Sequence, residues 1–164
     1  CQRPFSALIL SKMDPDEPFN PEYYHFVLQS LTLNSRAIIT ELSTIADRFP
    51  EHAEEIVDLI EERIRKCLPL QKLFTIYLLD SICKNVGNPY NLFFGSRLYK
   101  IFTESYLVVT DTPTRQDIIN LYKTWQGAKI TDGADLFTEP VVQKTEKFII
   151  LAILIGHKFE PQHK

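Results

Sequence analysis

The hydrophobic positions of the chain repeat with helical spacing in almost every segment that is long enough to show a period. Between residues 36 and 48, for example, Ile38, Leu42 and Ile45 recur three or four positions apart, which places them on one face of a helix. Alternating patterns typical of strands do not exceed about four residues, the lower end of ordinary strand length. The pattern therefore predicts an all-α protein.

Proline and polar residues mark where these helices begin. Proline is tolerated in a first turn because its missing N–H would have no partner there, and five of the ten prolines stand at such positions: Pro21, Pro50, Pro69, Pro113 and Pro140. The candidate N-caps are Asn20, Asn34 or Ser35, Thr112 and Thr138. The predicted helices, about eight in all, span residues 21–31, 35–48, 51–67, 69–86, 90–94, 96–109, 112–125 and 140–155. Their short connections favour an α-solenoid-like superhelix.

Length and composition fit a single domain. The chain has 164 residues, of which 45% are hydrophobic and 24% charged, which are ordinary globular values. We expect residues 1–12 to be an upstream remnant or added segment, residues 13–20 a flexible acidic lead-in, residues 21–156 the domain, and residues 157–164 a tail. The net charge of −3 argues against extensive wrapping of duplex DNA, although a local basic patch stays compatible with it.

The residue types that carry out catalysis are scattered. The four histidines lie far apart and form no HExxH pattern, and no glycine-rich phosphate loop is present. Cys67 and Cys83 occupy apolar helical positions and are expected to be core thiols, and the odd, widely spaced set of three cysteines favours a reducing compartment. The longest apolar run, residues 148–155, is too short to cross a bilayer. We expect no enzyme activity, cofactor, metal or membrane association.

The helix predicted over residues 69–86 is apolar nearly all round in its first half, which is typical of a central helix. Its polar residues gather at the C-terminal end. Tyr77, Asp80 and Lys84 share one column, and Ser81 and Asn85 lie in the column beside it. This stripe offers apolar contact, a carboxylate and a cation, which suits an amphipathic peptide. The alternative is structural, since Asp80 and Lys84 form a favourable i,i+4 pair.

The run from Leu79 to Gly87 (LDSICKNVG), with Asn34-Ser35-Arg36 and the segment from Pro69 to Leu73, resembles the CTD-interacting domain (CID) family. Within it, the chain resembles the CID of the cleavage factor IA subunit, part of the machinery for pre-mRNA 3′-end cleavage, polyadenylation and transcription termination. The resemblance covers about residues 22–154. It implies eight helices in a right-handed superhelix and binding of the heptad-repeat tail (YSPTSPS) of the largest RNA polymerase II subunit.

The resemblance also implies which residues contact the tail. Phosphate is preferred on the second-position serine of the heptad, and Asp80 corresponds to the family aspartate that accepts a hydrogen bond from the heptad tyrosine. No arginine follows Arg115 in the helix at 112–125, so Lys123 is the candidate to meet the phosphate, with a merely solvated lysine as the alternative. The full set of candidate peptide-binding residues is Asp80, Asn34, Ser35, Arg36, Tyr77, Ser81, Lys84, Asn85, Asn120 and Lys123. Helix capping is the alternative role for Asn34 and Ser35.

Two other binding functions stay open. The first is a VHS- or ENTH-type trafficking domain that binds a sorting peptide, ubiquitin or lipid; residues 13–25 carry four acids and no Lys or Arg, which counts against a lipid-binding lead-in. The second is a weak RNA contact through the basic cluster Arg63, Arg65, Lys66 and Lys72. The sequence thus predicts a nuclear phosphopeptide-binding module, whose other 3′-end processing partners bind through regions outside this chain.

Overall fold

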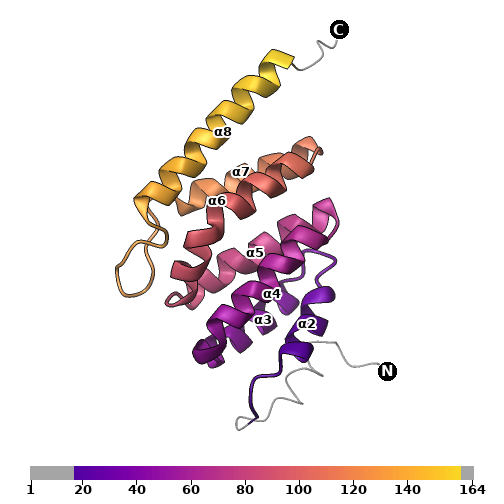
Figure 1. The fold of residues 1–164 in the computed structure, drawn as a ribbon, viewed down its shortest axis with the longest axis vertical. Helices are drawn as coiled ribbons and strands as arrows, with labels where there is room; N and C mark the ends of the chain where they lie inside the picture. The colour runs from indigo at the N-terminus through magenta and orange to yellow at the C-terminus, as the bar shows by residue number, and fades with distance from the viewer. Residues whose placement is uncertain (1–16, 160–164) are drawn as a thin grey trace.

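The computed structural model describes residues 17–159 and shows a stack of helices (Figure 1). The elements are α2 (Pro21–Gln29), α3 (Arg36–Arg48), a 3₁₀ turn η1 (Pro50–His52), α4 (Ala53–Lys66), α5 (Pro69–Asn85), α6 (Tyr90–Val108), α7 (Thr112–Trp125) and α8 (Glu139–Phe159). Within these described residues the only β-pairing is an isolated bridge between Lys129 and Asp135. The all-α prediction is confirmed, and residues 17–159 contain seven α-helices where eight were expected.

The helices form two layers. In Figure 1, α4 lies in front of α3, and α6 lies in front of α7. The central helix α5 packs against α3, α4, α6 and α7, whereas α8 packs along α6 and projects beyond the rest. The centrality of α5 follows from its nearly continuous apolar surface, because a helix without a polar face must be covered on all sides.

The predicted break between residues 94 and 96 is wrong. The helix α6 runs unbroken from Tyr90 to Val108 and changes direction along its length in Figure 1. The Gly95-Ser96 pair lies inside it, and the Ser96 hydroxyl donates to the Phe93 carbonyl at 2.8 Å. Glycine and serine weaken a helix and commonly accompany a bend, so tertiary packing has overridden the local signal.

The N-cap of α7 and the end of α8 also differ from the prediction. The N-cap of α7 is Asp111, whose carboxylate accepts from the Thr114 N–H at 3.0 Å, so Thr112 is the first helical residue and not the cap. Aspartate is an equally good cap, and the two positions are adjacent in sequence. The last helix continues through Gly156 to Phe159. By contrast, Asn20 and Ser35 cap α2 and α3 as expected.

Two buried tyrosines hold α3 in the core. The Tyr24 hydroxyl donates to the Leu42 carbonyl at 3.2 Å, and the Tyr90 hydroxyl donates to the Ala46 carbonyl at 2.6 Å. Both side chains are fully buried. Each bond satisfies a hydroxyl that would otherwise be costly to bury, and together they fix the position of α3 relative to α2 and α6.

Other predictions concern the cysteines and the ends of the chain. Cys83 is fully buried, and burial raises the pKa of its thiol well above the usual value, as expected for a structural thiol. No helix among the described residues is long and apolar enough to cross a membrane. The segment expected to be an upstream remnant, residues 1–12, lies outside the described residues.

Candidate functional site

The carboxylate of Asp80 lies where α5 meets α7. The Trp125 indole Nε1–H donates to its Oδ1 at 2.8 Å, and the Lys84 ammonium lies 2.8 Å from the same oxygen. Trp125 is 1% exposed, whereas the side chain of Asp80 is 17% exposed. The carboxylate is therefore held in a fixed orientation by one buried donor and one cation while part of it remains accessible.

Lys84 connects the two helices. Besides its pair with Asp80, its ammonium donates to the Thr124 hydroxyl at 2.8 Å, and that hydroxyl donates in turn to the Leu121 carbonyl at 2.7 Å. The side chain of Lys84 is 32% exposed. The i,i+4 pair predicted from sequence is thus present, but it forms part of a network that crosses to α7.

Ser81 faces α3. Its hydroxyl lies 2.9 Å from the hydroxyl of Ser43 on α3, and the Asn85 side-chain amide donates to it at 3.2 Å. Ser43 is buried and Asn85 is exposed. Ser81 and Asn85 therefore form a pair, as their adjacent positions on the helix predict.

Tyr77 lies one turn before Asp80 on α5 and is partly exposed. Burial raises the pKa of its hydroxyl, and the negative charges of Asp117 and Asp80 raise it further. The hydroxyl consequently stays protonated at neutral pH and is available as a hydrogen-bond donor.

The N-terminus of α3 holds the three polar residues at positions 34–36. The Ser35 hydroxyl accepts from the Ile38 N–H at 3.3 Å and so acts as the N-cap, while Asn34 and Arg36 are exposed. Arg36 has no ion pair within residues 17–159. Ser35 therefore has the capping role, while its contact with a peptide remains a prediction. The helix end also retains an exposed arginine beside the positive end of the helix dipole.

On α7, Asn120 and Lys123 are both exposed. The Gln116 amide donates to Asn120 Oδ1 at 2.9 Å, and Lys123 has no ion pair in the described part of the chain. The structure therefore leaves Lys123 free to meet an anion but gives it no fixed orientation.

We refer to Asp80, Ser81, Lys84, Thr124 and Trp125 as the α5–α7 polar cluster. Sequence reasoning found the members of this cluster on α5 but missed Thr124 and Trp125 on α7. It also missed Ser43 on α3, the partner of Ser81 outside the cluster. The ring of Trp125 is buried in the core, but a buried indole N–H needs an acceptor, and that requirement was the available signal. The cluster offers an oriented acceptor and a cation for a peptide. No group of three His, Cys, Asp or Glu that could hold a metal occurs in residues 17–159.

The basic cluster proposed for RNA is largely engaged in internal contacts. Arg63 donates to the Leu31 carbonyl and to Gln71, and Lys66 pairs with Glu62. Lys72 is buried and donates to backbone carbonyls of α4. Of the four side chains, Arg65 alone is exposed and has no ion pair among the described residues.

Comparison with known proteins places the chain in a family. The sequence model of the CID domain family matches residues 22–136 of this chain. The chain is 42% identical to Protein PCF11 of Saccharomyces cerevisiae over 146 residues, which is 89% of this chain and 23% of that protein. It is 33% identical to Polyadenylation and cleavage factor homolog 11 of Caenorhabditis elegans over 116 residues, which is 70% of this chain and 14% of that protein.

A solved structure agrees with these matches. The crystal structure of the RPR of Pcf11 superposes with a TM-score of 0.75 at 42% identity and covers 80% of this chain and 99% of that one. By contrast, the chain spans under a quarter of the length of Protein PCF11 and of the worm homologue. Because the family model covers most of the helical stack, the chain belongs to the CID family, whose members are non-catalytic domains that bind the C-terminal tail of RNA polymerase II.

Proposed function

We propose that this domain binds the heptad tail of RNA polymerase II at the surface formed by α3, α5 and α7, with a preference for phosphate on the second-position serine. The observation that carries the proposal is the orientation of Asp80 by Trp125 and Lys84. A tyrosine hydroxyl that donates to an ionised carboxylate makes a bond about twice as strong as a neutral one. A carboxylate already held by two partners loses little freedom when a third donor arrives.

The phosphate preference rests on the positive end of α3. Arg36 is exposed at that helix N-terminus, where free N–H groups and the helix dipole favour an anion. Lys123 on α7 adds a second exposed cation. Neither cation is buried, so the phosphate adds only modest affinity, about 1 kcal/mol or less, and the tyrosine and proline contacts supply most of the binding.

The proposed role in the cell follows from the relatives. PCF11 of yeast and the worm homologue, which is named as a polyadenylation and cleavage factor, are longer proteins that contain a similar segment. We infer that this domain brings a nuclear 3′-end processing and termination factor to the transcribing polymerase. Contacts with other subunits of that machinery then lie in regions outside this chain.

A fluorescence-anisotropy titration tests the proposal. A labelled two-repeat heptad peptide is used unmodified, phosphorylated at both second positions, or phosphorylated at both fifth positions. The second-position form should bind most tightly, and Asp80→Ala should weaken all three forms. Equal affinity for the second- and fifth-position forms would remove the phosphate preference, and an unchanged affinity of Asp80→Ala would remove the proposed site.

A VHS- or ENTH-type trafficking function is the second candidate, because those domains share this type of helical stack. Its lipid-binding version would need exposed cations near α2, where the described residues include the acids Glu17 and Glu22. Pelleting with liposomes that contain anionic lipid separates the two functions: binding to liposomes without binding to any heptad peptide would favour trafficking.

A further inference from the structure

A cavity on the α4–α6 side of the molecule shares no residue with the α5–α7 polar cluster. It has a volume of about 440 Å³ and is lined by Ile64, Arg65, Lys72, Ile101, Glu104, Ser105, Leu107 and Val108. This volume lies within the range of about 300–1,000 Å³ that is usual for ligand pockets. The lining comes from the ends of α4 and α6 and from the start of α5.

The cavity contains a buried ammonium. Lys72 is 5% exposed and donates to the Ile64 carbonyl at 2.6 Å and to the Arg65 carbonyl at 3.0 Å, two carbonyls in the last turn of α4, where the helix itself supplies no N–H partner. An ammonium has three N–H donors, and Lys72 makes no ion pair with the described residues. Lys72 is therefore a lining residue whose positive charge is not balanced by a carboxylate within residues 17–159.

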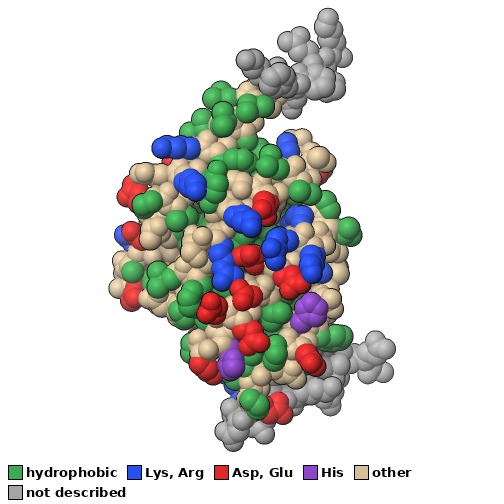
Figure 2. Space-filling view, viewed as in Figure 1, with side chains coloured by type: hydrophobic (Ala, Val, Ile, Leu, Met, Phe, Trp, Pro, Cys, Tyr) green, Lys and Arg blue, Asp and Glu red, His purple; other side chains and the backbone are tan. Residues whose placement is uncertain are grey.

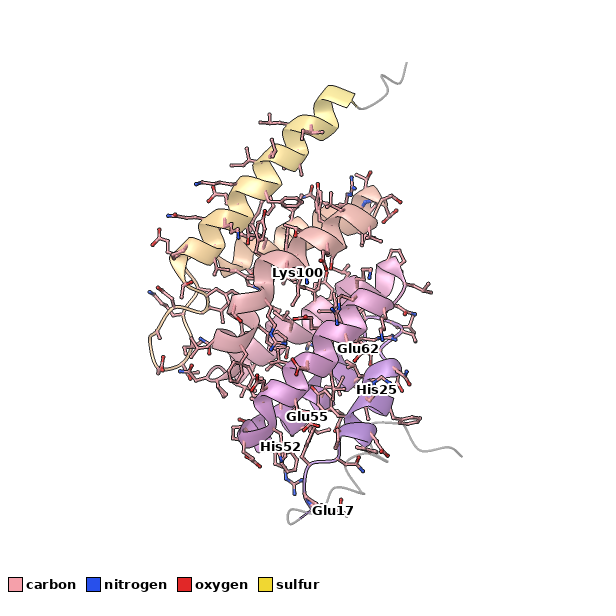
Figure 3. All side chains as sticks on the ribbon, in the orientation of Figure 1. Glu17, His25, His52, Glu55, Glu62 and Lys100 are labelled. Atoms are coloured by element: carbon pink, nitrogen blue, oxygen red, sulfur yellow. The ribbon has the colours of Figure 1, made fainter. Side chains whose placement is uncertain are left out.

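The remainder of the wall is largely aliphatic. Leu107 and Val108 at the end of α6 are 63% and 53% exposed, and the lining residues Ile64 and Ile101 are buried. Exposed aliphatic side chains beside a cavity are typical of a contact site for another molecule. Figure 2 shows Lys and Arg side chains interspersed with Asp and Glu near the middle of this face, and Figure 3 labels Glu62 of α4 and Lys100 of α6 on it.

The charges favour an anionic partner. The cavity is lined by two cations, Lys72 and Arg65, and by one carboxylate, Glu104. None of the three has an ion pair within residues 17–159. A single-stranded nucleic acid would also bring negative charge, but its bases are usually stacked on aromatic rings. No aromatic residue lines this cavity, whereas four aliphatic residues do.

We propose that this cavity, between α4, α6 and the start of α5, is a second peptide-docking site that takes an acidic segment with adjacent large aliphatic side chains. The aliphatic side chains enter between Leu107, Val108 and Ile101, and the flanking carboxylates meet Lys72 and Arg65. Because the site does not include the polar cluster, a peptide can occupy it while the heptad tail is bound.

Amide chemical-shift mapping by NMR on the full chain tests the proposal. The probe is the hexapeptide acetyl-EDLLDE-amide, with acetyl-EDSSDE-amide and acetyl-KRLLRK-amide as matched controls. The probe should shift amides at the ends of α4 and α6 and bind at least about tenfold more tightly than either control. Shifts centred on α3 and α7, or equal binding of a control peptide, would overturn the proposal. Tighter binding of an oligouridine at these same amides would assign the site to RNA instead.

Charge variants at exposed positions avoid loss of folding. Arg65→Glu should lower the affinity for the probe peptide by about fivefold or more, while Glu104→Gln should raise that affinity by about twofold. Lys147→Glu, an equal charge reversal at an exposed position of α8, should leave the affinity unchanged. An equal loss in Arg65→Glu and Lys147→Glu would mean that net charge alone attracts the probe, and the proposal would fail.

Discussion

The indole of Trp125 on α7 and the carboxylate of Asp80 on α5 are joined by a hydrogen bond of 2.8 Å across 45 residues of sequence. One residue is a core side chain by its burial, and the other is the proposed ligand-binding acid. Their contact makes the orientation of the site depend on the packing of α7 against α5. Trp125 therefore contributes both to the packing of the core and to the orientation of the proposed binding site.

Replacing the indole tests this dependence. Trp125→Phe removes the N–H donor and part of the ring, so the free energy of unfolding should fall by about 2–4 kcal/mol. The affinity for the second-position phosphopeptide should fall by about three- to tenfold, because Asp80 loses its buried donor. Urea denaturation and the anisotropy titration give the two values.

The control for this experiment is Phe137→Leu. The ring of Phe137 packs edge-on against Trp125 at 5.4 Å between ring centroids but makes no hydrogen bond to Asp80. This variant should lose stability and keep its peptide affinity. A similar loss of affinity in both variants would show that general loosening of the core, not the hydrogen bond, weakens binding.

Much of the helical stack was predictable because its signals are local. Asn20 and Ser35 cap helices, and Gly87 adopts a positive φ of 82° just beyond α5, as a helix C-terminus favours. The continuity of α6 through Gly95 was not predictable in this way, because it depends on packing against α4, α5 and α8. Local propensity is a weak guide where tertiary contacts dominate.

The candidate site likewise has features that the sequence predicts and features that depend on how the helices pack. The column of Tyr77, Asp80 and Lys84 follows from helical periodicity alone and is present in the structure. The contacts that cross between helices, Ser43 with Ser81 and Thr124 with Lys84, have no sequence signal because they depend on how α3 and α7 are placed. The predicted peptide contacts of Asn120 and Lys123 remain predictions, and a truncation of Lys123 tests the second of them.

Truncation of two site residues should rank their contributions to binding. Asp80→Ala should lower the affinity for the second-position phosphopeptide by about ten- to a hundredfold, since a hydrogen bond to a charged group contributes about 1.5–3 kcal/mol. Lys123→Ala should lower the same affinity by less than about fivefold, because an exposed charge pair is screened. Anisotropy at two salt concentrations measures both, and only the Lys123 effect should shrink markedly at higher salt. The reverse ranking would place the peptide on α7 and away from Asp80.

The buried ammonium of Lys72 should contribute measurably to stability. Lys72→Met leaves the Ile64 and Arg65 carbonyls without their donor, so the free energy of unfolding should fall by about 2–3 kcal/mol. The matched change Lys66→Met removes an exposed lysine paired with Glu62 at 2.6 Å and should alter stability by at most about 0.5 kcal/mol. Guanidinium denaturation of both variants gives the comparison; equal effects would mean that the Lys72 bonds add nothing beyond an exposed pair.

The buried tyrosines predict a loss of stability at alkaline pH. Burial raises the pKa of the Tyr24 hydroxyl and that of the Tyr90 hydroxyl far above the usual value near 10. Above about pH 10 the unfolded chain loses these protons while the folded chain keeps them, so the unfolded state is favoured as pH rises. Each tyrosine should lower the free energy of unfolding by about 1.4 kcal/mol per pH unit in that range, with no such contribution below it.

Tyr90→Phe isolates this effect from other titrating groups. The variant should be less stable than the wild type at pH 8, because the bond to the Ala46 carbonyl is lost, but its stability should fall less steeply between about pH 10 and 11.5. The buried Cys83 thiol, whose pKa is also raised by burial, contributes to both proteins alike and cancels in the difference. Phe94→Leu, a core change without a titratable group, should lower stability equally at every pH. Parallel pH profiles for Tyr90→Phe and the wild type would mean that the Tyr90 hydroxyl ionises in the folded protein as readily as in the unfolded chain.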